Sequence, residues 1–228
     1  MLQAIDLQCI RGERRLFEGL SFELRPGEGL HIAGENGAGK TSLLRVLCGL
    51  LHPTEGEVRW DGKPILRARE EFGADLAFVG HLNGVKDDLT ALENIRLEAA
   101  IRGGPGRGGD PGGNADGAEE ALARMGLGAF GDVLARHLSQ GQKRRVALAR
   151  LCGATSARIW ILDEPFNALD AAAVATLNGL IAAQLARGGI VILTAHLPVG
   201  LSDRIRRLEL RAPEPDDAEG YADGEAPA

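Results

Sequence analysis

The stretch Gly34–Ser42 reads GENGAGKTS, and it decides the fold class of this chain. It fits the pattern G-x-x-x-x-G-K-[ST] in full and lies between an expected strand, Gly29–Ala33, and an expected helix, Thr41–Gly49. That context matters because a phosphate site of this type needs backbone N–H groups and a helix N-terminus at one point. The stretch therefore predicts a nucleotide-binding loop of the P-loop NTPase type.

Each part of this loop has an expected role toward ATP and Mg²⁺. The glycines let the backbone wrap the phosphates, and the Lys40 ammonium neutralises the β- and γ-phosphate oxygens. The Thr41 hydroxyl is expected to ligate Mg²⁺, and the Ser42 hydroxyl adds a contact to the phosphates. The predicted ATP-binding residues are Gly34, Glu35, Asn36, Gly37, Ala38, Gly39, Lys40, Thr41 and Ser42.

Two adjacent carboxylates follow a second apolar strand. Ile159–Leu162 runs directly into Asp163 and Glu164. In P-loop ATPases the first acid supports the Mg²⁺ shell, so Asp163 is expected to hold the metal, through a water molecule. The next acid, Glu164, projects differently and is expected to polarise the attacking water as the catalytic base. A strand that ends in two acids is a weak signal alone, but with the phosphate loop upstream it predicts ATP hydrolysis.

Strands and helices alternate over most of the chain, which predicts an α/β fold with a largely parallel sheet. The first sixty residues contain mainly strands and turns, and we expect an antiparallel β subdomain there. The region from about 82 to 156 shows no strand, so we expect an inserted helical subdomain. The expected strands are Gly19–Leu24, Gly29–Ala33, Thr54–Trp60, Lys63–Leu66, Leu76–Gly80, Ile159–Leu162 and Ile190–Thr194, and the expected helices are Thr41–Gly49, Thr90–Arg102, Ala118–Met125, Gln140–Cys152 and Ala171–Arg187.

Composition separates a folded domain from a tail. The chain has 228 residues, 44% of them hydrophobic, which is enough for one α/β core. We expect one domain over residues 1–211 and an acidic, disordered tail over 212–228, because that tail holds six acids and no Lys or Arg. The formal net charge is −6, so the domain without its tail is neutral and does not favour nucleic-acid binding. The apolar runs are too short to predict a membrane-spanning helix.

Five short motifs then appear in a fixed order. They are the phosphate loop at Gly34–Ser42, LSQGQ at Leu138–Gln142, ILDEP at Ile161–Pro165, NALD at Asn167–Asp170 and TAH at Thr194–His196. In this order they resemble the nucleotide-binding domain of ABC transporters. The resemblance covers Leu2–Leu210, nearly the whole chain, and it implies the ABC ATPase fold.

The resemblance also implies partners and further site residues. Two such domains pack head to tail, and each ATP lies between the phosphate loop of one copy and the signature of the other. Here the signature residues are Ser139, Gln140, Gly141 and Gln142, at the start of a helix that can bind an anion. By the same resemblance Asp170 belongs to the D-loop, and His196 is the switch histidine that senses the γ-phosphate beside Glu164. A separate integral membrane permease is the implied partner, which places the chain peripherally on the cytoplasmic face of the bacterial inner membrane.

Two positions depart from the usual pattern. Arg11 aligns with the aromatic residue that stacks on adenine, so a guanidinium would have to replace that ring. His81 aligns with the Q-loop glutamine, which contacts Mg²⁺ and water and faces the membrane partner. An imidazole can also hydrogen-bond water, and its charge state near neutral pH is open.

Similarity over short sequence segments narrows the family to one subfamily. Six segments are similar to the ATP-binding subunit of the bacterial cytochrome c maturation, or haem exporter, system: 14–22, 79–81, 89–94, 142–151, 160–166 and 189–194. That resemblance implies a role beside haem chaperone machinery. The alternatives are a soluble ABC ATPase in cofactor assembly, the ATPase subunit of another ABC exporter, or a nucleotide-binding protein without turnover. Glu164 and His196 argue against the last of these.

Overall fold

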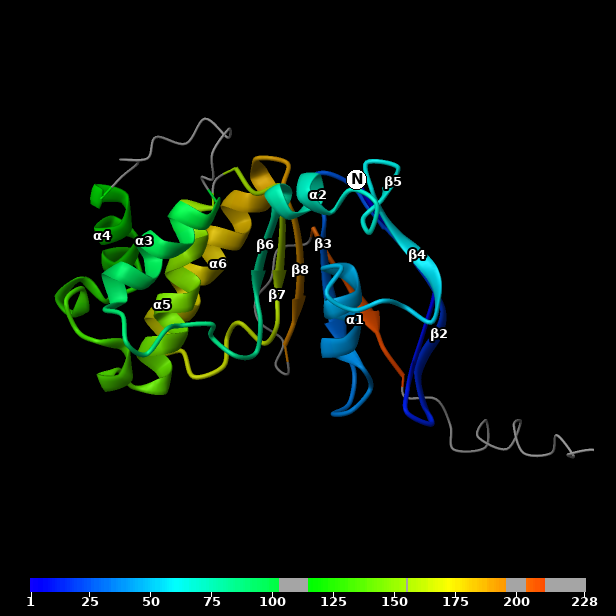
Figure 1. The fold of residues 1–228 in the computed structure, drawn as a ribbon, viewed down its shortest axis with the longest axis horizontal. Helices are drawn as coiled ribbons and strands as arrows, with labels where there is room; N and C mark the ends of the chain where they lie inside the picture. The colour runs from blue at the N-terminus through cyan, green and yellow to red at the C-terminus, as the bar shows by residue number, and fades with distance from the viewer. Residues whose placement is uncertain (103–114, 155, 196–203, 212–228) are drawn as a thin grey trace, which may run out of the picture.

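The computed structural model describes residues 1–102, 115–154, 156–195 and 204–211 (Figure 1). Two sheets lie side by side, and a group of helices flanks the larger one. The strands are β1 (Leu2–Arg11), β2 (Arg14–Leu24), β3 (Gly29–Ala33), β4 (Glu55–Trp60), β5 (Lys63–Pro64), β6 (Leu76–Val79), β7 (Ile159–Leu162), β8 (Ile190–Thr194) and β9 (Ile205–Glu209). The helices are α1 (Lys40–Leu47), α2 (Arg69–Asp75), α3 (Ala91–Arg102), α4 (Ala115–Arg124), α5 (Gln140–Gly153) and α6 (Ala171–Ala186), with short 3₁₀ turns at Gly128–Phe130 and Ala135–His137.

The larger sheet is parallel and has the order β6-β7-β8-β3-β9. Strand β7, which lies between β6 and β8, is buried on both faces, and its successive side chains enter different cores. Ile159 and Ile161 pack with α1 and the antiparallel strands, whereas Trp160 and Leu162 pack with α3, α5 and α6. This alternation follows from the two-residue period of a strand. It explains why a continuous apolar run precedes Asp163.

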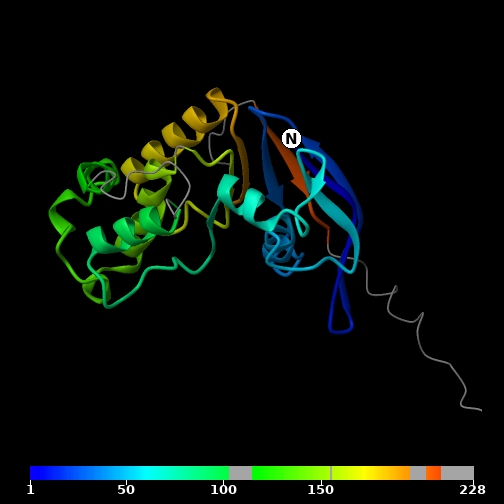
Figure 2. The same ribbon diagram turned by 45° about the horizontal axis from the view of Figure 1, so that its top comes forward.

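The smaller sheet is antiparallel, with the order β2-β1-β4-β5. Strand β1 pairs with β2 on one side and with β4 on the other. Helix α1 lies between this sheet and the parallel sheet in both views (Figures 1 and 2). The predicted antiparallel β subdomain is therefore present.

The helices α3, α4 and α5 form the predicted helical subdomain on the far side of the parallel sheet (Figure 2). Helix α3 begins with the expected capping box, in which the Thr90 N–H donates to Glu93 at 2.8 Å and the Glu93 N–H donates to the Thr90 hydroxyl at 3.1 Å. Of the helices in the described ranges, none combines the length and apolar character that crossing a membrane requires.

Several boundaries differ from the sequence prediction. Helix α4 begins at Ala115, three residues before the expected start at Ala118, and α1 ends before Gly49, which has φ +70°. Strand β1, helix α2 and strand β9 were not predicted as separate elements. Helix α2 has seven residues and buries only Phe72, so it carries no apolar period. Strand β9 lies at the edge of the sheet and contains two arginines. Charged residues are common in edge strands, and here they obscure the apolar pattern by which a buried strand is predicted.

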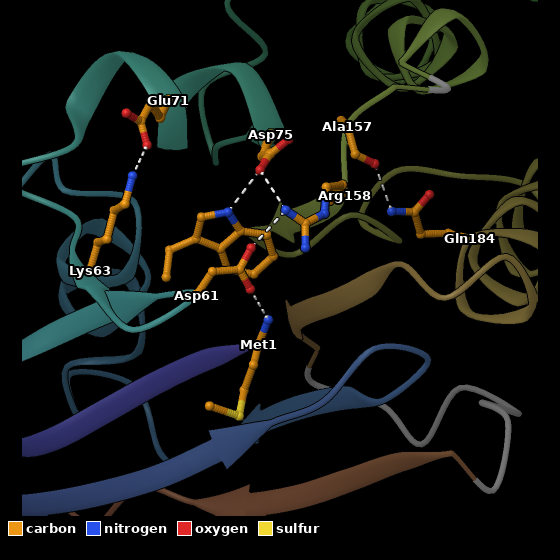
Figure 3. A network of polar contacts seen from close by, with 9 residues as sticks. Met1, Asp61, Lys63, Glu71, Asp75, Ala157, Arg158 and Gln184 are labelled. Atoms are coloured by element: carbon orange, nitrogen blue, oxygen red, sulfur yellow. Dashed lines mark hydrogen bonds and ion pairs between the residues drawn. The ribbon is translucent and has the colours of Figure 1, made fainter.

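One polar network joins the two sheets at the start of β7 (Figure 3). The Arg158 guanidinium donates to Asp61 at 2.8 Å and to Asp75 at 3.1 Å, and it lies 4.8 Å from the centre of the Trp60 ring. The Trp60 indole N–H donates to the same Asp75 carboxylate at 2.8 Å. The network connects the β4–β5 turn and α2 to the strand that carries Asp163 at its other end.

Candidate active site

The phosphate loop connects β3 to α1, as the motif predicted. Gly34 and Gly39 have φ angles of +144° and +91°, in the region that favours glycine. A Cβ on Gly34 would lie 2.3 Å from the Leu210 carbonyl oxygen, so no larger residue fits there. Gly39 is the N-cap of α1, which directs the first N–H groups of that helix into the loop. The loop therefore has the geometry of an anion site.

Lys40 is buried beside the loop, although a lysine ammonium is usually solvated. Lys40 is 8% exposed, and its Nζ donates to the carbonyl oxygens of Gly34 at 2.7 Å and Glu35 at 2.9 Å. These two bonds hold the positive charge over the turn of the loop. The charge is thus in position for the phosphate oxygens of a nucleotide.

Asp163 is brought next to Thr41, 122 residues earlier in the chain. Asp163 is 2% exposed, and its Oδ2 accepts a hydrogen bond from the Thr41 hydroxyl at 3.0 Å. Its Oδ1 accepts from the Thr194 hydroxyl at 2.8 Å. A carboxylate and a hydroxyl at this distance fit Mg²⁺, which usually binds one or two protein oxygens together with substrate phosphates.

Glu164 follows in a backbone conformation that is unusual for its type, with φ +50°. Its N–H donates to the Thr194 hydroxyl at 2.8 Å, and its Oε2 accepts from the Asn167 side-chain amide at 2.5 Å. The His81 Nδ1 lies 3.6 Å from the same Oε2. The Glu164 carboxylate is 19% exposed, so solvent still reaches it. Its position beside Asp163 suits a group that activates water next to a bound phosphate.

The structure places the predicted residue His81 beside Glu164. His81 lies two residues after the end of β6, and its side chain is 68% exposed. Its role at the Q-loop position stays a prediction. The predicted switch residue His196 lies outside the described residues. Arg14 was not considered from the sequence, but it lies beside the loop: a Cβ on Gly37 would be 3.6 Å from its Nη1.

The signature residues form the N-terminus of α5. Ser139 is the N-cap, its side chain accepts from the Gln142 N–H at 3.2 Å, and its own N–H donates to the Gln142 side chain at 2.8 Å. A Cβ on Gly141 would lie 2.8 Å from the Ala168 carbonyl oxygen, so this helix needs glycine to pack against the segment before α6. Asp170 caps α6 and lies 3.6 Å from the Arg145 guanidinium. The predicted signature and D-loop segments are therefore neighbours within one chain.

Two functional candidates were missed from the sequence: Thr194 and Arg144. Thr194 hydrogen-bonds both Asp163 and Glu164. It is the last residue of the buried strand β8, so the sequence alone indicates only a packing role for it. Arg144 lies within the basic run Lys143–Arg145, which is typical of a solvated helix face, yet it is 5% exposed. Burial lowers the pKa of Arg144, and the charges of Asp163 and Glu164 oppose that change.

Residues 17–167 match the family model described as ABC transporter. This chain belongs to the ABC transporter family. The predicted family and fold class are therefore confirmed, and the two-sheet architecture with a helical subdomain is that of the ABC ATPase. The chain binds ATP and is an ATPase, as the phosphate loop and the acids after β7 predicted.

Curated relatives of this ABC ATPase match nearly its whole length. It is 50% identical over 211 residues to the cytochrome c biogenesis ATP-binding export protein CcmA of Dechloromonas aromatica, covering 92% of this chain and 100% of that protein. The protein of the same name from Salmonella typhi is 50% identical over 213 residues, covering 92% of this chain and 97% of the relative.

Solved ABC cassettes share the fold. A dimeric, post-hydrolysis state of the ATP-binding cassette MJ0796 bound to ADP and Pi aligns with a TM-score of 0.76 and 26% identity, covering 92% of this chain and 96% of that one. The ATP-binding subunit of an ABC transporter aligns with a TM-score of 0.76 and 25% identity, covering 93% of this chain and 88% of the other.

Proposed function

We propose that this ABC ATPase is the ATP-hydrolysing subunit of a haem export, or cytochrome c biogenesis, complex. The observation that carries the proposal is the identity of about half of all residues to CcmA proteins, over nearly the full length of both chains. In this proposal the energy of ATP binding and hydrolysis drives a separate membrane permease. The complex would lie on the bacterial inner membrane, with this chain on its cytoplasmic face.

Hydrolysis is proposed to use the residues that converge at the ends of β7 and β8. When Mg²⁺ is bound, it neutralises charge on the β- and γ-phosphates, and Thr41 and Asp163 would hold it, Asp163 through water. Lys40 neutralises further phosphate charge. Glu164 polarises the attacking water, and His81 lies close enough to orient that water or the carboxylate.

The chain is proposed to act as a head-to-tail dimer. Ser139 and the N–H groups at the start of α5 form an anion site that, in one copy, would bind the γ-phosphate held by the loop of the other copy. The MJ0796 cassette, with a TM-score of 0.76, is dimeric with ADP and Pi bound. ATP would then join the two copies, and hydrolysis would separate them.

The permease is proposed to contact the surface near His81 and α3. Three large apolar side chains are exposed there: Leu82 at 84%, Ile101 at 67% and Leu97 at 40%. Exposed apolar side chains mark an interaction surface where they form a contiguous patch, and Leu50, at 64%, is exposed elsewhere on the chain. The same complex would include haem chaperone machinery, and nothing in the charge of the domain favours nucleic acid as a partner.

The substitution Glu164→Gln tests the hydrolytic part of this proposal. It keeps the size of the side chain and removes the base, so we expect ATP to bind normally, turnover to fall at least about 100-fold and an ATP-bound dimer to accumulate. Glu71→Gln, the same change at an exposed side chain of α2 outside the site, is the matched control. Wild-type turnover in the Glu164→Gln protein would contradict the catalytic role of Glu164.

Co-purification tests the proposed complex. A membrane permease should co-purify with this chain from detergent extracts, whereas recovery with soluble partners alone would favour a role in cofactor assembly.

A further inference from the structure

A single buried guanidinium connects the signature helix to both acids of the active site. Arg144 lies on α5, and its Nη2 donates to the carbonyl oxygens of Asp163 at 2.7 Å and Glu164 at 2.9 Å. Its Nη1 donates to the Gly80 carbonyl oxygen at 2.8 Å and to the Asn83 side chain at 3.1 Å. One side chain thus holds the loop after β7 and the loop after β6 at the same time.

This arrangement is unusual because a charge is buried where packing alone does not require one. Arg144 is 5% exposed, and burying a charge is unfavourable unless its hydrogen bonds are well made. The four acceptors on Arg144 are two loop carbonyls after β7, one loop carbonyl after β6 and one amide oxygen. The two Nη groups of a planar guanidinium supply donors for this set, whereas the buried Nε of Arg144 has no hydrogen-bond partner.

The peptide groups that flank Glu164 show what this contact does. With φ +50°, Glu164 occupies a conformation that persists only where the surroundings hold it. Its N–H is held by the Thr194 hydroxyl, and its C=O is held by Arg144. We propose that Arg144 is a positioning residue for hydrolysis: it fixes the backbone of Glu164 so that the carboxylate points at the attacking water.

The same contact couples Glu164 to the signature. Ser139 caps α5, and Arg144 lies five residues later on the same helix, so the two move together. A shift of α5 relative to the parallel sheet would withdraw the guanidinium from the Glu164 carbonyl. Hydrolysis at the chain's own phosphate loop would then depend on where its signature helix lies. This inference rests on the proposed catalytic role of Glu164.

Two substitutions of Arg144 test the proposal, with Arg150→Lys as the matched control. Arg144→Lys keeps the charge but cannot bond both loops, and Arg144→Gln removes the buried charge while keeping a donor. Arg150 lies on the same helix and donates to the Gly84 carbonyl oxygen at 2.7 Å, away from both acids. A displacement of about 1 Å costs catalysis on the order of 100-fold. We therefore expect kcat to fall about 10- to 100-fold in both Arg144 variants, with the Kd for ATP unchanged within about twofold.

The readouts separate positioning from a merely structural role. ATP binding and thermal unfolding are measured beside kcat, and Arg150→Lys is expected to keep wild-type kcat. A folded Arg144 variant with wild-type kcat would overturn the proposal, and so would a loss of ATP affinity as large as the loss of kcat. If both Arg144 variants fail to fold while Arg150→Lys folds, Arg144 serves stability and the proposal is wrong. If Glu164→Gln retains turnover, the proposed function fails first; if Glu164→Gln is inactive and Arg144→Lys is fully active, only the inference about Arg144 fails.

Discussion

Replacing Thr194 with valine removes one hydroxyl and leaves the shape of the side chain unchanged. Thr194 is fully buried, donates to the Asp163 Oδ1 at 2.8 Å and accepts from the Glu164 N–H at 2.8 Å. The bond to the buried carboxylate is worth about 1.5–3 kcal/mol, and the bond from the backbone about 0.5–1.5 kcal/mol. Thr194→Val should therefore destabilise the chain by about 2–4 kcal/mol and lower kcat, because the Glu164 amide loses its partner.

The control is Thr194→Ser, which keeps the hydroxyl and removes one methyl group at a cost of about 1 kcal/mol. For a chain of this size each kcal/mol lowers the melting temperature by about 2–4 °C, so the valine variant should melt roughly 5–15 °C below wild type. Scanning calorimetry and steady-state ATPase assays measure both effects. A valine variant that melts with wild type, or a serine variant that loses as much stability as valine, would refute the role given to the hydroxyl.

Three further substitutions test separate parts of the account. Lys40→Ala should raise the Kd for ATP at least about 100-fold in calorimetric titrations, because the phosphate charge loses its buried partner; unchanged affinity would argue against the loop. Gly141→Ala places a Cβ 2.8 Å from the Ala168 carbonyl oxygen and should cost about 1–3 kcal/mol in urea unfolding while ATP binding persists; full stability would show that the packing is loose. Burial raises the pKa of Asp61, but the hydrogen bonds and charges of the α-amino group and Arg158 outweigh burial and leave that pKa below its ordinary value. The ionised Asp61 therefore stabilises the fold at pH 7, and this stabilisation is lost as the pH falls through the depressed pKa. The urea midpoints of wild type and Asp61→Asn should differ at pH 7 and converge as the pH falls below the ordinary Asp pKa of about 3.9, and a constant difference would contradict this.

Local signals in the sequence were sufficient for the elements that carry the site. Strands β7 and β8 were predicted with their observed bounds, because both are short apolar runs buried on each face. The phosphate loop was predicted from the spacing of its glycines and Lys40 and from the strand and helix on either side, because these residues are neighbours in the sequence. The catalytic and metal roles of Glu164, Asp163 and Thr41 remain predictions, now supported by their proximity.

The groups that hold the acids could not be predicted, because their partners are distant in the sequence. Thr194 contacts Asp163 across 31 residues, and Arg144 reaches Gly80 across 64. Neither contact leaves a periodic signal, and the arginine lies in a basic run that predicts a solvated surface. The role of His81 at the Q-loop position stays a prediction, as does that of His196. The acidic tail 212–228 lies outside the described residues.

The central claim is that two copies of the chain complete each ATP site, and a mixing experiment tests it directly. Lys40→Ala chains keep the signature, and chains that carry Ser139→Arg and Gly141→Asp keep the phosphate loop. ATPase activity is measured for each variant alone and for their equimolar mixture. We expect each variant alone to be inactive and the mixture to hydrolyse ATP, because a mixed dimer contains one intact site. A mixture that stays inactive although mixed dimers form, or a signature variant that is fully active alone, would contradict the account.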